Sequence, residues 1–275
     1  LPDVDAPRRS QSGTFAGSQC ARAQASVRGR GRTRGRGDSE PASRMVGEAR
    51  RSHARGGRPA MKIFITGATG YIGGSIAATM RDAGHEIVGL VRSDERANQA
   101  VAEGIKPIVG SLDDPDVLAR AVTRAEAVIN CASSDHSGAV EVMLSAMEGT
   151  NKLFMHTSGT SIVGYPDEGE KRDGVYDEDT PFTPSPGRLG RVRINDDIIE
   201  AARRGVHTVI LCPCLIYGEG LGVNKDSMQV PWLLDVARKF GVAKHIGSGG
   251  NIWSNVHIQD LAALYLWQWI RRRLE

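Results

Sequence analysis

From residue 61 onwards, short apolar runs alternate with longer stretches in which apolar residues recur at helical spacing. Residues 61–66, MKIFIT, form a β-branched apolar run that predicts a buried strand. Residues 75–84, SIAATMRDAG, follow with helical periodicity and close on a glycine, which is typical of a helix end. Further strands are expected at residues 85–93, 105–110, 125–133, 152–159 and 207–218. Strands separated by helices predict an α/β fold with a doubly wound, Rossmann-type parallel sheet.

The turn between the first strand and the first helix is rich in glycine. Gly67, Gly70 and Gly73 form a GxxGxxG pattern within GATGYIGG. In Rossmann-type folds the first glycine permits the tight turn, the second lets the backbone approach a pyrophosphate, and the third lets the helix pack on the strand. The helix N-terminus adds free N–H groups and a partial positive charge. We therefore expect a dinucleotide to bind at Gly67, Thr69, Gly70, Tyr71, Ile72 and Gly73.

The end of the second predicted strand carries Arg92. Folds of this type often place an acidic residue there to bind the ribose of NAD, whereas a basic residue pairs with the 2′-phosphate of NADP. Arg92, with Ser93 as a further donor, favours NADP as the cofactor. NAD stays an alternative, because Asp94 or Glu95 could reach the ribose.

The first sixty residues differ in composition from the rest of the chain. They contain 13 arginines, no lysine and five acidic residues, whereas residues 61–275 contain 22 basic and 27 acidic residues. With little apolar periodicity, residues 1–60 are expected to be a disordered Arg/Gly-rich extension. We favour sequence that is not part of the natural protein, because Met61 stands directly before the first strand. A targeting or solvated tail is a second interpretation. The least favoured is nucleic-acid binding through RGRGRTRGRG at residues 28–37.

Several motifs resemble, in their order, the extended and atypical short-chain dehydrogenase/reductases, in particular the NAD-dependent epimerase/dehydratase group. They are TGATGYIGG (66–74), GSLDD (110–114), INCAS (129–133), TSGTS (157–161), DEDTPFTP (177–184), CPCLIYGEG (212–220) and NVHIQDLA (255–262). The resemblance implies an NAD(P)-binding Rossmann domain at residues 61–212. Residues 213–275 would then form a partial, truncated substrate-binding region mixed with the last Rossmann elements. It also implies cofactor contacts at Ser111, Leu112, Asn130, Ala132, Ser133 and Pro213.

The chain departs from this family at the residues that carry its chemistry. Members usually reduce or oxidise carbonyls with a YxxxK pair, but none of the five tyrosines is followed by lysine at the fourth position. The hydroxyls of Thr157, Ser158 and Ser161 are the candidates to replace that pair, with His136 and His156 next. Arg191–Arg193 occupies the helix where the lysine is expected, so a guanidinium there could orient the nicotinamide ribose, polarise a substrate oxygen or simply be solvated.

Two functions remain open from the sequence. The first is an NAD(P)-dependent oxidoreductase or epimerase/dehydratase-like enzyme acting on the carbonyl of an aldehyde, ketone or sugar-derived small molecule. The second is a non-catalytic NAD(P)-binding sensor or interaction protein with a degenerate active site. No metal-ligand spacing and no GxSxG motif occur in the sequence. We expect a soluble cytoplasmic protein without membrane contact, whose substrate and oligomeric state the sequence does not specify.

Overall fold

The structure is a computed structural model that describes residues 59–271. Expectations for residues 1–58, including the Arg/Gly run at 28–37, lie outside the described residues. Six parallel strands form the main sheet, in the order β3-β2-β1-β4-β5-β6. They are β1 (Lys62–Thr66), β2 (Glu86–Val91), β3 (Lys106–Val109), β4 (Ala127–Asn130), β5 (Leu153–Thr157) and β6 (His207–Leu211). This order confirms the doubly wound Rossmann-type prediction and places the switch point between β1 and β4.

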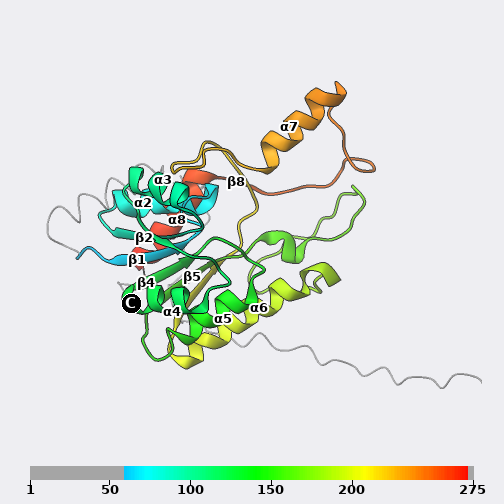
Figure 1. Ribbon diagram of the computed structural model, residues 1–275. Helices are drawn as coiled ribbons and strands as arrows, with labels where there is room; N and C mark the ends of the chain where they lie inside the picture. The colour runs from blue at the N-terminus through cyan, green and yellow to red at the C-terminus, as the bar shows by residue number, and fades with distance from the viewer. Residues whose placement is uncertain (1–58, 272–275) are drawn as a thin grey trace, which may run out of the picture. The chain divides into compact units, whose positions relative to one another are not determined.

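Helices cover both faces of this sheet (Figure 1). On one face lie α2 (Tyr71–Asp82), α3 (Asp94–Ala102) and α8 (Ile258–Arg271), and on the other lie α4 (Pro115–Arg124), α5 (Ser137–Ser145) and α6 (Leu189–Ala201). Short 3₁₀ turns occur at Thr160–Val163, Pro186–Arg188 and Ala202–Arg204. Strand alternation supplies both cores: Ile63 and Ile65 pack on the α2/α8 side, while Phe64 packs on the α4–α6 side.

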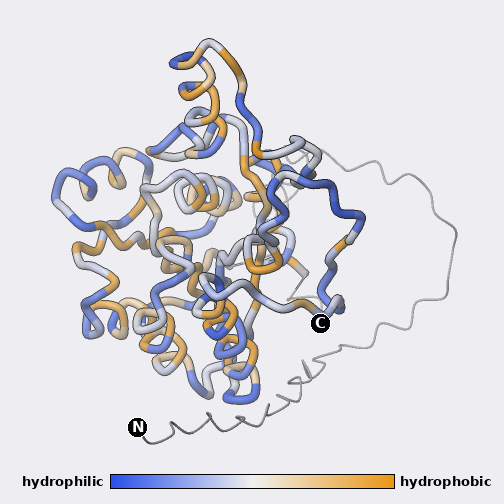
Figure 2. The backbone as a smooth tube through the Cα atoms, turned by 90° about the vertical axis from the view of Figure 1, so that its right-hand side faces the viewer, coloured by the Kyte–Doolittle hydropathy of each residue, from blue (hydrophilic) through white to orange (hydrophobic). Residues whose placement is uncertain are grey.

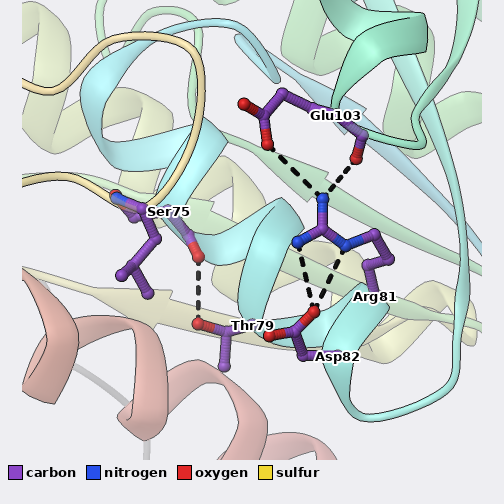
Figure 3. Close-up of polar contacts among 6 residues, drawn as sticks. Ser75, Thr79, Arg81, Asp82 and Glu103 are labelled. Atoms are coloured by element: carbon purple, nitrogen blue, oxygen red, sulfur yellow. Dashed lines mark hydrogen bonds and ion pairs between the residues drawn. The ribbon is translucent and has the colours of Figure 1, made fainter.

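Helix α2, which follows the glycine turn, is fixed along its length by polar contacts (Figure 3). Near its C-terminal end, Arg81 bonds the carboxylate of Asp82 at 3.1 Å and also contacts the backbone carbonyl of Glu103. Within the helix, Thr79 donates its hydroxyl to the carbonyl of Ser75 at 3.0 Å. Of these contacts, the one between Arg81 and Glu103 joins α2 to the end of α3.

A second, two-stranded sheet corrects the expectation of one strand over residues 207–218. Strand β6 ends at Leu211, and β7 (Leu215–Tyr217) pairs instead with β8 (Asn255–His257). Pro213 explains the break, because it cannot donate a hydrogen bond to a neighbouring strand. The nearby helix α7 (Gln229–Phe240) has no buried residue, and its apolar positions colour orange at the top of Figure 2.

Candidate functional site

The glycine turn between β1 and α2 has the geometry that its spacing predicts. Gly67 adopts φ +73°, and a Cβ on it would lie 3.0 Å from backbone atoms of Ala132. A Cβ on Gly73 would lie 2.3 Å from the carbonyl oxygen of Gly67, so a side chain there would push the helix away from the turn. These two positions therefore require glycine for backbone packing.

Gly70 has a different reason to be glycine. A Cβ on Gly70 would meet only the carbonyl oxygen of Gly67, at 3.2 Å. Gly70 is the N-cap of α2, and no side chain caps that end of the helix. The backbone is therefore open where amides and the helix dipole favour an anion, which fits the pyrophosphate of a dinucleotide.

The β1 and β4 ends are tied together by Thr66, which the sequence reasoning did not single out. Its hydroxyl donates to Oδ1 of Asn130 at 2.5 Å and accepts from the amides of Cys131 and Ala132, each at 3.2 Å. Asn130 and Ala132 were predicted to contact the cofactor; the backbone of Ala132 lies against Gly67, whereas Asn130 is buried and bonded to Thr66 and His156. A threonine at a strand end next to the glycine turn is the signal that could have found this contact.

The segment after β7 packs directly on the first turns of α2. The Tyr71 hydroxyl donates to the carbonyl of Gly218 at 2.7 Å, and the amide of Leu221 donates to Oγ of Ser75 at 3.0 Å. A Cβ on Gly222 would lie 2.7 Å from Gly74, so the two backbones touch. Residues 218–222, which follow β7, thus lie beside the glycine turn.

The remaining predicted cofactor residues follow other strands at the same edge of the sheet. Arg92 is exposed immediately after β2, whereas Ser93 caps α3 by accepting from the amide of Arg96 at 3.3 Å. Ser111 follows β3, and its Oγ accepts from the amide of Asp113 at 3.1 Å. The other three are Leu112 after β3, Ser133 after β4 and Pro213 after β6.

The candidate hydroxyl of Thr157 lies in the interior of the protein. Its Oγ1 is 2.6 Å from the hydroxyl of Tyr265 on α8 and 3.1 Å from Sγ of Cys131. Burial raises the pKa of Cys131 to about 12, and burial likewise raises the pKa of Tyr265. Thr157 therefore joins a buried hydrogen-bonded group on the α8 side of the sheet.

Ser161 lies with charged groups at the other side of the same edge. Nη1 of Arg191 donates to Oγ of Ser161 at 2.9 Å, and Nε of Arg191 donates to Oδ1 of Asp135 at 2.8 Å. Nη2 of Arg191 bonds the second oxygen of the same carboxylate. The Arg191 hydrogen bond holds the pKa of Asp135 below its usual range. The structure thus brings together Asp135, which follows β4, Ser161, which follows β5, and Arg191 in the first turn of α6.

Ser158 and Cys212 adjoin this group. Ser158 is buried, and its Oγ has no hydrogen-bond partner among the residues that the structure describes. Burial raises the pKa of Cys212, and the neighbouring Ser158 and Arg191 oppose that shift. The buried hydroxyl of Ser158 thus lies beside the Cys212 thiol, which Arg191 also influences.

The two candidate histidines have separate environments. His136 caps α5 through Nδ1, which accepts from the amide of Ala139 at 3.1 Å, and its Nε2 lies 3.0 Å from Asp113. His156 is buried, and this burial lowers its pKa to about 4. Neither histidine is hydrogen-bonded to Ser161 or Arg191 in any described contact.

Among residues 59–271, no group of three or more His, Cys, Asp or Glu side chains is arranged to hold a metal ion. Within that same range, no helix has the length and apolar character needed to cross a bilayer.

Comparison with known proteins points to one family. A model described as "NAD dependent epimerase/dehydratase family" matches residues 63–271. An uncharacterized protein of Schizosaccharomyces pombe is 34% identical over 218 residues, covering 75% of this chain and 70% of that protein. A 2-alkyl-3-oxoalkanoate reductase of Stenotrophomonas maltophilia is 28% identical, covering 74% and 63%. The solved structure of MoeE5 with UDP-glucose and NAD shares the fold at TM-score 0.57 and 18% identity, covering 73% and 69%.

Proposed function

Because this chain belongs to the NAD-dependent epimerase/dehydratase family, we propose that it is an oxidoreductase that uses NADP or NAD and acts on a carbonyl group of a small molecule. The observation that carries the proposal is the glycine turn. Gly67 and Gly73 are packed so that no side chain fits, while Gly70 leaves the uncapped start of α2 open to a phosphate. The open start of α2 supports dinucleotide binding, and turnover separates an enzyme from a protein that only binds the cofactor.

The cofactor we favour is NADP. Arg92 is exposed at the end of β2, where a guanidinium can pair with a 2′-phosphate, and neither Arg92 nor its neighbour Ser93 supplies the carboxylate that NAD-binding proteins often place there. Ser93 itself is occupied as the cap of α3. The preference therefore depends on Arg92, and NAD remains the alternative cofactor.

We propose Ser158 and Ser161 as the hydroxyls that serve the substrate, with Ser161 partly exposed and Ser158 buried close behind it. Both follow β5 at the carboxyl edge of the sheet, where open α/β folds bind their ligands. When bound, the nicotinamide supplies a hydride to a carbonyl carbon or accepts one from the corresponding alcohol. The serines would bind the substrate oxygen and supply its proton. Thr157, the third candidate, has its hydroxyl engaged by Tyr265 and Cys131 instead.

The substrate we propose is a small carbonyl compound such as an aldehyde, a ketone or a sugar derivative. A relative named as a 2-alkyl-3-oxoalkanoate reductase supports including 3-oxo acids among the compounds tested. We also propose a cytoplasmic location, because Cys131, Cys212 and Cys214 are free thiols, as reducing compartments maintain them.

A non-catalytic cofactor sensor is the second candidate, because YxxxK is absent from the sequence. Turnover distinguishes the two functions. Purified protein with NADPH or NADH is assayed against aldehydes, ketones, 3-oxo acids and nucleotide sugars, and the double variant Ser158→Ala/Ser161→Ala is assayed beside it. We expect carbonyl reduction, lowered at least about tenfold in the double variant, with unchanged NADPH affinity. A protein that binds NADPH and turns over none of these compounds would be the sensor.

A further inference from the structure

We propose that Arg191 is a positioning residue for catalysis, which holds and polarises the hydroxyl of Ser161. This inference rests on the proposed function and concerns how the reaction proceeds without YxxxK. In that pair a lysine lowers the pKa of the tyrosine that donates the proton. Here a guanidinium touches a serine instead, at the edge of the sheet where the substrate is expected.

The hydrogen bond from Arg191 leaves the hydroxyl proton of Ser161 free to be donated. Nη1 of Arg191 can only donate, so at 2.9 Å the oxygen of Ser161 accepts from it. A hydroxyl has one proton and two lone pairs, and therefore the Ser161 proton stays available for a substrate oxygen. The arrangement makes Ser161 a donor that is already oriented.

Asp135 fixes the guanidinium in place. Its two carboxylate oxygens accept hydrogen bonds from Nε and Nη2 of Arg191. This bidentate geometry orients an arginine most strictly. The Arg191 side chain is 13% exposed, whereas Arg203, at the other end of the α6 region, is 66% exposed and pairs with Glu200. Arg191 is therefore not one of the solvated charges of its helix.

The charge at this place suits the developing negative charge on oxygen. In carbonyl reduction the carbonyl carbon receives the hydride, the π electrons move to oxygen, and that oxygen takes the Ser161 proton. The serine oxygen then recovers a proton from water. Arg191 stabilises Ser161 while the proton is leaving, and it keeps its own protons throughout because its pKa is raised further by Asp135.

Three other titratable groups lie close enough to influence Arg191 or Asp135. Arg188 and His156 also act on Asp135, and His156 is neutral at physiological pH because burial lowers its pKa to about 4. Cys212 lies close enough to interact with Arg191, and its own pKa is raised. None of these groups donates to Ser161 in a described contact, so Arg191 is the one cation bonded to that hydroxyl in the described part of the chain.

Steady-state carbonyl reduction by Arg191→Met, Arg191→Lys and Ser161→Ala tests the inference, with Arg203→Met as the matched control. We expect Arg191→Met to lower kcat about 10- to 100-fold with NADPH affinity within twofold, and Arg203→Met to match the wild type. Combining Ser161→Ala with Arg191→Met should add little, because the two residues act as a unit. Arg191→Lys should recover part of kcat and lose it above about pH 10, where lysine deprotonates, a limb absent from the wild type.

The fold is checked by thermal melting of every variant. If Arg191→Met does not fold, the double variant Asp135→Asn/Arg191→Gln replaces it, because it leaves no unpaired charge behind. By NMR, the Nε–H of Arg191 should be protected from exchange in the wild type and exposed in Asp135→Asn. The inference would be overturned, and the proposed function kept, if carbonyl reduction stayed at the wild-type rate without Arg191. The same holds if the effects of the Arg191 and Ser161 substitutions on kcat multiplied independently. A wild type that binds NADPH but reduces nothing would overturn the proposed function and this inference with it.

Discussion

The side-chain amide nitrogen of Asn130 lies 3.0 Å from Nδ1 of His156 inside the sheet edge. An amide nitrogen can only donate, so Nδ1 accepts and the ring proton of His156 resides on Nε2. Nε2 is buried without a hydrogen-bond partner among the described residues. The ring is thus held neutral in one tautomer, because no acceptor in that surrounding would stabilise a second proton.

Stability should fall as the pH falls below the range in which free histidine titrates. Burial, and then Arg191, lower the pKa of His156 to about 4, whereas the unfolded chain titrates near 6.5. At a pH between these two pKa values, His156 is protonated in the unfolded chain and neutral in the folded protein. The stability due to neutral His156 is complete above about pH 6.5, and about 2–3 kcal/mol of it should be lost by about pH 4.5.

Urea unfolding at these two pH values measures this loss in the wild type and in His156→Gln. The lowered pKa of Asp135 also weakens the fold in acid, but that contribution is shared by both proteins. The glutamine variant should therefore show a smaller loss between the two pH values. An identical pH dependence in the two proteins would mean that His156 does not titrate as its burial predicts.

A mutant cycle on Thr157 and Tyr265 should separate a structural contact from a catalytic one. Their hydroxyl oxygens lie 2.6 Å apart in the core. Tyr265→Phe or Thr157→Val alone should each cost about 1–2 kcal/mol of unfolding free energy, because the other hydroxyl loses a buried partner. The double variant should cost less than the sum. Carbonyl reduction per folded molecule should stay within about twofold, and a tenfold loss in Thr157→Val alone would restore Thr157 as a proton donor.

Strand alternation explains why one of the three candidate hydroxyls, that of Thr157, points to the α8 face of the sheet and away from the other two. Successive residues of β5 point to opposite faces, so Thr157 follows Met155 toward α8 while Ser158 does not. The period of two along a strand is enough to predict from the sequence that Thr157 and Ser158 point to opposite faces of the sheet. What the sequence lacked was the identity of the helix on each face, since Tyr265 is 108 residues from Thr157.

The glycine turn and the order of strands were predictable because both depend on local patterns. The GxxGxxG spacing predicts its own backbone geometry, and apolar runs mark the six strands of the main sheet, although not the separate pair β7 and β8. By contrast, Arg191 and Asp135 are 56 residues apart and meet only because β4, β5 and α6 share one sheet edge. Side-chain pairing of this kind depends on tertiary packing, which no single-sequence periodicity contains.

Gly73→Ala should abolish tight cofactor binding, while a glycine in open space elsewhere in the chain tolerates the same change. Its new Cβ would lie 2.3 Å from the carbonyl oxygen of Gly67, which is backbone and cannot move aside. We expect a loss of about 1–3 kcal/mol in stability and at least tenfold in NADPH affinity. Gly187→Ala is the control, because nothing lies within 4 Å of its added Cβ. Fluorescence titration and thermal melting give both values, and normal affinity in Gly73→Ala would place the pyrophosphate elsewhere.

The preference for NADP should depend on one exposed guanidinium. Arg92 follows β2 with Ser93 already occupied as a helix cap, so Arg92 would provide the principal charge for a 2′-phosphate. Arg92→Asp should weaken NADPH binding at least tenfold and leave NADH binding unchanged or stronger, because a carboxylate repels the phosphate and accepts from a ribose hydroxyl. Arg120→Asp makes the same charge change on the exposed side of α4 and should alter neither affinity. Titration of each protein with NADPH and with NADH measures these affinities. If the wild type binds NADH as tightly as NADPH, or if Arg92→Asp behaves like Arg120→Asp, Arg92 does not bind the 2′-phosphate. NAD then becomes the favoured cofactor.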